Sequence, residues 1–118
     1  MLHGIYSADM RQLKRLAAKP RFRSRFFSPQ EMKFLMDKSF SPHLIADMYC
    51  GKIAFAKTLG ARFKGCKLNE VSVLADYNGS YYLSLSGNAR KTFASLKMNS
   101  VISCTHTKSI VTASVIIN

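Results

Sequence analysis

The stretch that most constrains the fold runs from Leu44 to Gly60 and reads LIADMYCGKIAFAKTLG. Apolar residues fall on nearly every side of a helix built from this stretch, which leaves it almost no polar face. Such a helix must be covered by other elements on most sides. Ser41 and Pro42 are placed to begin it, and Gly60 is a natural C-cap. We therefore expect a central buried helix around which the rest of the chain packs.

Shorter elements precede this helix. Residues 2–7 read as a first strand, after which Asp9 can cap a helix that Pro20 stops. Ser28 begins a further helix, because a proline follows it and Glu31 lies three residues later, as in a capping box. The first half of the chain is therefore expected to be mainly helical.

The second half changes to the alternating pattern of strands. VSVLADYNGSYYLSLSG alternates on both sides of Asn78-Gly79, a pair that favours a two-residue hairpin turn. Residues 88–97 fit a short helix, and the strands VISCTHT and IVTASVII then form a second hairpin. This order predicts an α+β fold in which a mainly antiparallel sheet packs on the buried helix. We expect one domain, residues 1–118.

The charge of the chain is strongly positive. Its 118 residues include 18 lysines and arginines against 6 aspartates and glutamates, a formal net charge of +12. Seven of these cations lie between Arg11 and Arg25, with no acid before Glu31. Because like charges at this density repel one another, we expect an anionic partner: nucleic acid, a phosphorylated cofactor or an acidic protein.

The cysteines and the apolar runs indicate the cellular setting. Three cysteines without a C-x-x-C spacing indicate neither a disulfide framework nor a zinc site, so reduced thiols are expected. No apolar run approaches the ~20 residues that cross a bilayer, and the N-terminus lacks the apolar core of a secretion signal. A cytoplasmic protein without membrane association is the expectation.

Five segments in register resemble the small holo-acyl-carrier-protein synthases, the phosphopantetheinyl transferases of fatty-acid synthesis. HGIYSADMRQLKRL is similar to the family's opening strand, aspartate and arginine, and RFRSRFFSPQE to its R-F-x-x-R segment leading into T-x-x-E. The apolar helix resembles F-L-A-x-R-[FW]-A-[AV]-K-E-A-[FL]-x-K-A-[LF]-G without a gap. NGSYYLSLSGNA resembles N-G-K-P-x-L-x-L-x-G-x-A, and ISCTHT with VTASVII resembles I-S-[LI]-S-H-T with A-x-A-x-V-I. The similarity covers essentially the whole chain.

This resemblance implies a fold, an activity and partners. Members of the family move phosphopantetheine from coenzyme A to a serine of an acyl carrier protein, and they are trimers with each site between neighbouring subunits. The attacked phosphorus belongs to a pyrophosphate, so a metal ion and cations must hold the developing charge. We therefore expect a 4'-phosphopantetheinyl transferase-like fold, coenzyme A as substrate, an acyl carrier protein as partner and a homotrimer.

The resemblance also implies roles for individual residues. Asp9 takes the place of the family's metal-binding aspartate, although a plain helix cap is the alternative role for this residue. Lys57 is placed to pair with the pyrophosphate or the attacked phosphoryl group, so Asp9 and Lys57 are the expected catalytic residues. Coenzyme A contacts are expected from Lys52, Lys57, His106 and Thr107, and carrier-protein contacts from Arg15, Arg21 and Arg25.

Two positions of the apolar helix depart from the family's pattern. Ile53 stands where the family has its metal-binding glutamate, and Met48 stands where an arginine faces coenzyme A phosphates. Replacing a carboxylate ligand by an alkyl group removes charge and coordination together. We therefore expect weakened Mg²⁺ binding. The Gly-Lys-Pro that borders the family's nucleotide pocket is also changed, to Gly79-Ser80-Tyr81.

Three functional hypotheses remain. The first is a synthase homologue that binds coenzyme A and carrier protein, with weak or altered transfer. The second is a non-enzymatic relative that binds an acidic carrier through its arginines. The third is a basic nucleic-acid-binding domain, suggested by the charge and by Phe22, Phe26 and Phe27 among the arginines. It ranks last, because those aromatic residues sit where the family packs its core.

Overall fold

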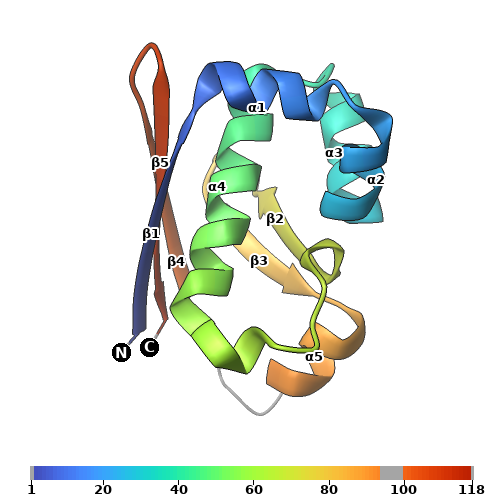
Figure 1. Ribbon diagram of the computed structural model, residues 1–118, viewed down its shortest axis with the longest axis vertical. Coiled ribbons are helices and arrows are strands. Elements are labelled where there is room, and N and C mark those ends of the chain that lie inside the picture. Colours follow the sequence, from blue (N-terminus) through green and yellow to red (C-terminus); the bar gives the residue numbers. More distant parts are fainter. Residues whose placement is uncertain (1, 94–99, 118) are drawn as a thin grey trace.

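The computed structural model describes residues 2–93 and 100–117 of the chain. A three-stranded sheet forms one side of the molecule, and the helices lie on the other side, with the long helix α4 next to the sheet (Figure 1). In chain order the elements are β1 (Leu2–Asp9), α1 (Met10–Ala17), α2 (Pro20–Phe26), α3 (Pro29–Asp37), α4 (Pro42–Leu59), the 3₁₀ turns η1 (Gly60–Phe63) and η2 (Leu68–Glu70), β2 (Val71–Ala75), β3 (Tyr81–Leu85), α5 (Gly87–Phe93), β4 (Ser100–His106) and β5 (Ile110–Ile117).

The three-stranded sheet has β5 in the middle, between β1 and β4, and both strand pairs are antiparallel. Along β1 and β5 the residues alternate between more and less buried positions, as expected when only one face of a sheet is covered. β2 and β3 form a separate antiparallel pair. The described residues therefore confirm the predicted α+β class with antiparallel strands.

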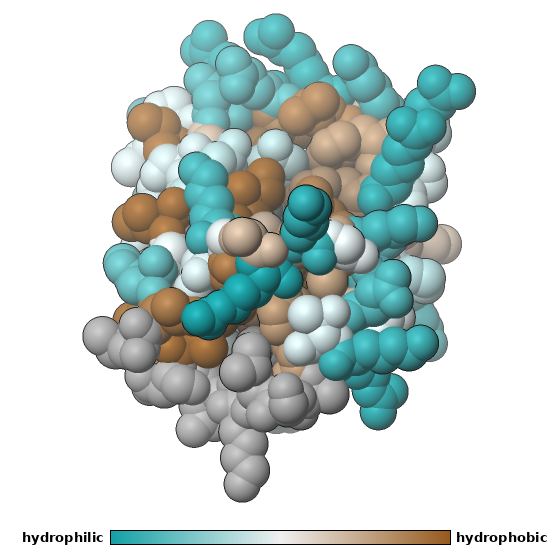
Figure 2. All heavy atoms as spheres, turned by 60° about the horizontal axis from the view of Figure 1, so that its bottom comes forward, coloured by the Kyte–Doolittle hydropathy of each residue, from teal (hydrophilic) through white to brown (hydrophobic). Residues whose placement is uncertain are grey.

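Among residues 2–93 and 100–117, no helix lies over the outer face of the three-stranded sheet (Figure 1). Ile5 of β1 and Val101 of β4 are each 57% exposed there. Seen from the end that carries α5, hydrophobic side chains reach the surface on the side where this sheet lies (Figure 2). This face is the sheet surface that the described part of the chain leaves uncovered.

The inner face of the sheet packs against α4, as the apolar pattern of this helix predicts. Met48, Ala54 and Phe55 are fully buried within it. Strand β1 comes close to the helix at Gly4, where an added Cβ would clash with the Thr58 hydroxyl and lie 2.6 Å from the Ala54 carbonyl oxygen. A glycine at this position lets the backbones of β1 and α4 approach each other.

A buried ion pair joins α4 to the elements on its other side. The Lys52 ammonium pairs with the Glu31 carboxylate, both side chains are fully buried, and Nζ also donates to the Phe26 carbonyl oxygen at 2.6 Å. Glu31 accepts further hydrogen bonds from the backbone N–H groups of Ser28 at 2.9 Å and Val73 at 3.0 Å. Burial raises the pKa of Glu31 and lowers that of Lys52, while each partner's charge opposes the shift. The pair ties α3, α4 and β2 together.

Two predictions of helix ends that depend only on residues close together in the sequence are confirmed. Ser28 and Glu31 form the predicted capping box of α3, and Gly60 ends α4 with a positive φ of 55°. The sequence analysis did not predict helix α2. Pro20 was expected only to stop α1, yet it also lies at the first turn of α2, a position where proline is well tolerated.

The first hairpin corrects the prediction of a two-residue turn. Residues 76–80 connect β2 to β3, and the Asp76 carboxylate accepts hydrogen bonds from the N–H groups of Asn78 at 2.9 Å and Ser80 at 3.0 Å. These side-chain bonds stabilise a longer loop. The helix expected at 88–97 is realised as α5 up to Phe93, and positions 94–97 lie outside the described residues.

Candidate functional site

The strand register brings three of the predicted site residues to one end of the sheet. Asp9 ends β1 opposite Ile110, and His106 ends β4 opposite Val111 of the same central strand. Asp9 and His106 are thus two strands apart, about 10 Å at the usual strand spacing. Thr107 follows His106 in the turn to β5. Asp9 therefore lies at the same end of the sheet as His106 and Thr107, which come much later in the sequence.

Asp9 is the N-cap of α1. Its carboxylate accepts a hydrogen bond from the Arg11 N–H at 2.7 Å, and the residue is exposed. The cap satisfies one of the free N–H groups at the start of the helix. The alternative role as helix cap is therefore realised, and metal binding by Asp9 stays a prediction.

Thr107 shapes the turn beside His106. Its N–H donates to the Ile110 carbonyl oxygen at 2.8 Å, and its hydroxyl accepts from the Ile110 N–H at 3.0 Å. Both polar groups of Thr107 are therefore engaged in the turn. The predicted nucleotide contact of Thr107 stays a prediction.

His106 faces a buried carboxylate that was not among the predicted site residues. Its Nε2 lies 2.8 Å from Oδ1 of Asp47, and the two side chains are 30% and 8% exposed. The distance is that of an ion pair, but the ring N–H is not directed at the oxygen, since Oδ1 has no hydrogen bond of acceptable geometry. Oδ2 accepts a hydrogen bond from the Tyr81 hydroxyl, and the His43 ring packs edge-on against His106 at 5.1 Å. We call Asp47, His106, Tyr81 and His43 the Asp47 cluster.

One hydroxyl and two thiols near Asp47 keep their protons. Burial, together with the hydrogen bond to Asp47, raises the pKa of Tyr81 above its ordinary value. Burial first, and then the charge of Asp47, raise the pKa values of Cys50 and Cys104 to about 12. Neither thiol forms an appreciable amount of thiolate at neutral pH, so neither suits a nucleophilic role.

Sequence reasoning missed Asp47, although one signal was present. It is the only acidic residue in α4, on a helix that is otherwise apolar or basic. A single carboxylate on such a helix needs a polar partner, because burying it alone is costly. The sequence distinguishes Tyr81 only because it stands where the family's Gly-Lys-Pro has its proline.

Lys57 lies exposed in the last turn of α4. Its Nζ is 4.8 Å from the centroid of the Tyr6 ring on β1. Within the described residues, no acidic side chain forms a salt bridge with it. An ammonium held against an aromatic face without a carboxylate keeps its charge available for an anion. This geometry suits the role predicted for Lys57.

Lys52 is placed differently. Its ammonium is fully buried between Glu31 and the rings of Phe26 and Phe27, at 4.7 and 5.4 Å from the ring centroids. This placement argues against the predicted contact with coenzyme A, because no part of the side chain is accessible. Lys52 serves the packing of the core.

The expected magnesium site keeps one of its two carboxylates, Asp9. Among residues 2–93 and 100–117, no group of three or more His, Cys, Asp and Glu side chains is arranged to hold a metal ion. Ile53 is half-buried and Met48 is fully buried, so both positions contribute to packing. Asp9 would be left as the single carboxylate, whereas Mg²⁺ favours carboxylates and phosphate oxygens in near-ideal octahedral geometry.

The arginines predicted to bind the carrier lie on α1 and α2, which are neighbours in the fold (Figure 1). Arg15, Arg21 and Arg25 are exposed. No salt bridge in the described part of the chain involves them. We call the exposed cations of this region the basic face: Arg11, Lys14, Arg15, Lys19, Arg21 and Arg25.

An apolar hollow of about 340 Å³ opens within the basic face. Phe22 and Phe26 line it together with three cationic residues, Lys19, Arg21 and Arg25. The two rings are stacked with centroids 5.1 Å apart. Apolar rings surrounded by cations suit an acidic partner that also presents an apolar side chain.

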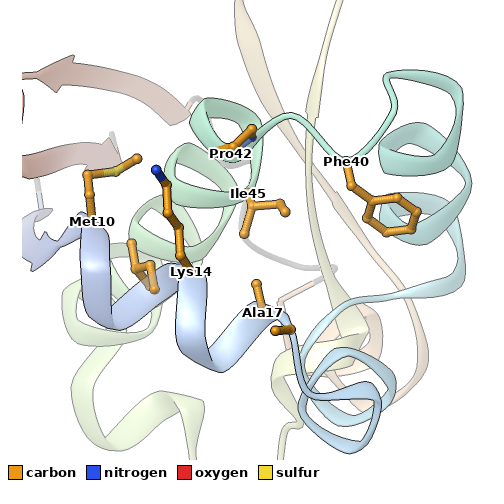
Figure 3. Close-up of a pocket in the computed structure, with 8 residues that line it drawn as sticks. Met10, Lys14, Ala17, Phe40, Pro42 and Ile45 are labelled. Carbon is orange, nitrogen blue, oxygen red and sulfur yellow. The ribbon is translucent and has the colours of Figure 1, made fainter.

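A second apolar cavity, of about 200 Å³, lies between α1 and the start of α4 (Figure 3). It contains none of the predicted site residues. Lys14 is the one charged side chain at its wall. The cavity is lined by Met10, Leu13, Lys14, Ala17, Ala18, Phe40, Pro42 and Ile45.

The described helices include none that is both long and apolar enough to cross a membrane. No protein-family model matches the chain. A holo-[acyl-carrier-protein] synthase from Alkaliphilus metalliredigens is 32% identical over 113 residues, which are 92% of this chain and 92% of that protein.

Solved structures of synthases share the fold. The holo-[acyl-carrier-protein] synthase of Neisseria meningitidis superimposes with a TM-score of 0.87 at 18% identity, covering 100% of this chain and 99% of that one. A synthase from Chronobacterium ammoniagenes, solved as a complex with coenzyme A, gives 0.81 at 22% identity, covering 99% and 96%. Each likeness extends over nearly the full length of both chains.

Proposed function

The chain belongs to the holo-[acyl-carrier-protein] synthase family, and from this premise we propose that it transfers 4'-phosphopantetheine from coenzyme A to a serine of an acyl carrier protein. Residues 1–118 act as a single domain. The observation that carries the proposal is the full-length similarity to a synthase, in sequence and in fold. The synthase from Chronobacterium ammoniagenes binds coenzyme A, which supports the same substrate here.

The basic face is the proposed docking surface for the carrier protein. Its unpaired cations attract an acidic partner, and Arg15, Arg21 and Arg25 are the residues that the family resemblance assigns to this contact. The hollow lined by Phe22 and Phe26 accepts an apolar side chain of the partner. The cations then provide orientation and a fast encounter, and the hollow provides buried area.

Lys57 and His106 are the proposed contacts of the phosphate groups. The exposed ammonium of Lys57 can hold negative charge that develops on the transferred phosphoryl group. His106 presents a partly exposed ring at the same end of the sheet as Asp9. Because the donor set offers Mg²⁺ a single carboxylate, the protein's own cations must hold more of that charge. We expect transfer to be slow for this reason.

Mass spectrometry of the carrier protein tests the proposal. An apo acyl carrier protein is incubated with the chain, coenzyme A and either Mg²⁺, Mn²⁺ or no added metal. The proposal predicts that the carrier gains the mass of one phosphopantetheine group. A carrier without mass gain under every condition contradicts the transfer reaction. A carrier with its acceptor serine replaced by alanine is the control.

A specific observation favours a second candidate, a relative that binds the carrier without chemistry. Ile53 and Met48 have become packing residues, whereas the basic face is intact. This candidate predicts carrier binding that weakens with salt and about tenfold with Arg15→Glu. Lys64→Glu is the control, because it changes the net charge equally at an exposed residue beyond η1. Equal binding by the two variants would exclude the basic face as docking surface.

We also propose a homotrimer. Support comes from the uncovered outer face of the three-stranded sheet, where Ile5 and Val101 are exposed. Burying aliphatic side chains of this kind against second copies of the chain contributes favourable free energy.

A further inference from the structure

Asp47 is a buried carboxylate, and one of its oxygens receives no hydrogen bond from the described residues. The residue is 6% exposed, and Oδ2 accepts from the Tyr81 hydroxyl, whereas Oδ1 has only the nearby Nε2 of His106 at 2.8 Å. We propose that Asp47 is a positioning residue for His106. It fixes the ring so that the other ring nitrogen, Nδ1, faces an anionic phosphate of coenzyme A. This inference rests on the proposed function and names how the site recognises its substrate.

The carboxylate dictates which ring nitrogen carries a proton. A nitrogen lone pair directed at Oδ1 would be repelled, so Nε2 must carry its hydrogen when it faces Asp47. The hydrogen-bond partner of one ring nitrogen thus decides which of the two nitrogens carries the proton in a neutral ring. His106 is 30% exposed at its side chain while Asp47 is buried beneath it. Nδ1 is therefore the nitrogen left for a ligand.

The neighbours of the ring support this orientation. His43 packs edge-on against His106, with the ring centroids 5.1 Å apart, and limits the rotation of the ring. Tyr81 and Cys104 have raised pKa values and keep their protons, so neither places a second negative charge beside the ring. A ring held between the Asp47 carboxylate and a substrate phosphate donates from both nitrogens and carries a positive charge. Such charge-assisted hydrogen bonds are among the stronger ones in proteins.

The imperfect geometry in the free chain fits a contact that tightens on binding. Oδ1 is within reach of Nε2, yet the N–H is not aligned with it. A small rotation of the ring would complete the hydrogen bond. Catalytic and binding hydrogen bonds are often long or misaligned before the ligand arrives. A buried oxygen without a partner makes that rotation favourable.

Calorimetric binding of coenzyme A tests the inference through a double-mutant cycle. Asp47→Asn keeps the shape and an acceptor for Tyr81 but removes the charge, and His106→Gln removes the ring. We expect each variant to bind coenzyme A about tenfold more weakly, and the double variant to bind no more weakly than His106→Gln alone. His3→Gln is the matched control, because it removes a histidine ring at the opposite end of the three-stranded sheet, where His3 contacts the Ser114 hydroxyl. It is expected to change affinity less than about twofold.

Several outcomes overturn the inference. An Asp47→Asn variant that binds coenzyme A as tightly as the wild type contradicts it. A double variant whose loss of binding free energy equals the sum of the two single losses also contradicts it. A His106→Gln variant with unchanged affinity contradicts the ring as a contact. A wild-type chain that binds no coenzyme A contradicts the proposed function itself, which separates the two failures.

Nitrogen NMR of the wild-type histidine rings provides a test that needs no variant to fold. The inference predicts a protonated Nε2 on His106 in the free chain, and a change of the Nδ1 resonance when coenzyme A is added. His3, whose Nε2 lies 2.9 Å from the Ser114 hydroxyl, is the internal control and should not respond. An unprotonated Nε2, or an Nδ1 resonance that ignores coenzyme A, contradicts the inference.

Discussion

At the scale of single residues, Glu31 and Asp47 are the buried carboxylates of the described part of the chain, and they differ in how far their oxygens are hydrogen-bonded. Glu31 is satisfied by Lys52 and by two backbone N–H groups, and both charges of the pair are removed from water. Asp47 retains an oxygen without an aligned donor, next to a ring that reaches the surface. A fully satisfied buried pair suits a structural role, and an incompletely satisfied carboxylate at the surface edge suits a binding site.

The structural role of the Glu31–Lys52 pair predicts an asymmetric response to mutation. Glu31→Gln alone leaves a buried ammonium without its counter-charge and should lower the free energy of unfolding by about 3–5 kcal/mol. Glu31→Gln combined with Lys52→Met removes both charges and should cost less than the single change. Urea unfolding measures all three proteins. A double variant less stable than Glu31→Gln would contradict a structural ion pair.

The same residues show how far sequence reasoning reaches. The capping box of Ser28 and Glu31 was predictable because it is local, whereas the pairing of Glu31 with Lys52 joins residues 21 positions apart. Lysine is rarely buried, so a surface role was the natural expectation for Lys52. His106 and Asp47 lie on different elements, and their contact depends on how α4 crosses the end of β4. Pairings of this kind follow from tertiary structure and not from spacing.

At the scale of elements, α4 organises the fold. It lies between the three-stranded sheet and the β2–β3 pair, and Gly51 on the helix faces Val73 of β2 and Ile102 of β4. The apolar pattern of this helix predicted its burial correctly. The turn at 76–80 was predicted less well, because the Asp76 side chain bonds its own loop and lengthens it. Side-chain bonds of this type compete with the shorter turn.

Two glycines test how α4 packs against its neighbours: Gly4 lies on β1 next to α4, and Gly51 lies within α4. Gly4→Ala places a methyl group against the Thr58 hydroxyl and the Ala54 carbonyl oxygen, and we expect a loss of about 1–3 kcal/mol in unfolding free energy. Gly51→Ala meets Val73 at an ordinary 3.5 Å and should be neutral or stabilising by up to about 1 kcal/mol, as for glycine in a helix interior. Thermal unfolding compares the variants. A stable Gly4→Ala variant would contradict the close approach of β1 and α4.

At the scale of the whole molecule, the chain has two distinct surfaces. The basic face carries exposed cations around an apolar hollow, and none of these cations forms a salt bridge with another described residue. The outer face of the three-stranded sheet carries the exposed aliphatic residues Ile5 and Val101, and no helix of the described part of the chain covers it. A charged face suits a transient acidic partner, and an uncovered sheet face suits permanent contact between copies.

The proposed trimer predicts that a charge on the sheet face weakens assembly. Ile5→Lys places an ammonium on this face and should shift the chain from trimer to monomer, because an unpaired charge is costly to bury in an interface. Sedimentation velocity measures the state. Met36→Lys, at a residue 64% exposed on α3, is the control and should leave the trimer intact. A monomeric wild type, or a trimeric Ile5→Lys variant, would contradict this face as the interface.

The central claim is that this chain has a transferase fold whose chemistry is limited at position 53. Transfer of phosphopantetheine to an apo acyl carrier protein, followed by mass spectrometry for the wild type and for Ile53→Glu with Mg²⁺, tests it most directly. We predict slow mass gain with the wild type and at least about tenfold faster gain with Ile53→Glu, because the added carboxylate would supply the second metal ligand that the family resemblance expects at this position. A carrier left unmodified by both proteins would contradict the claim.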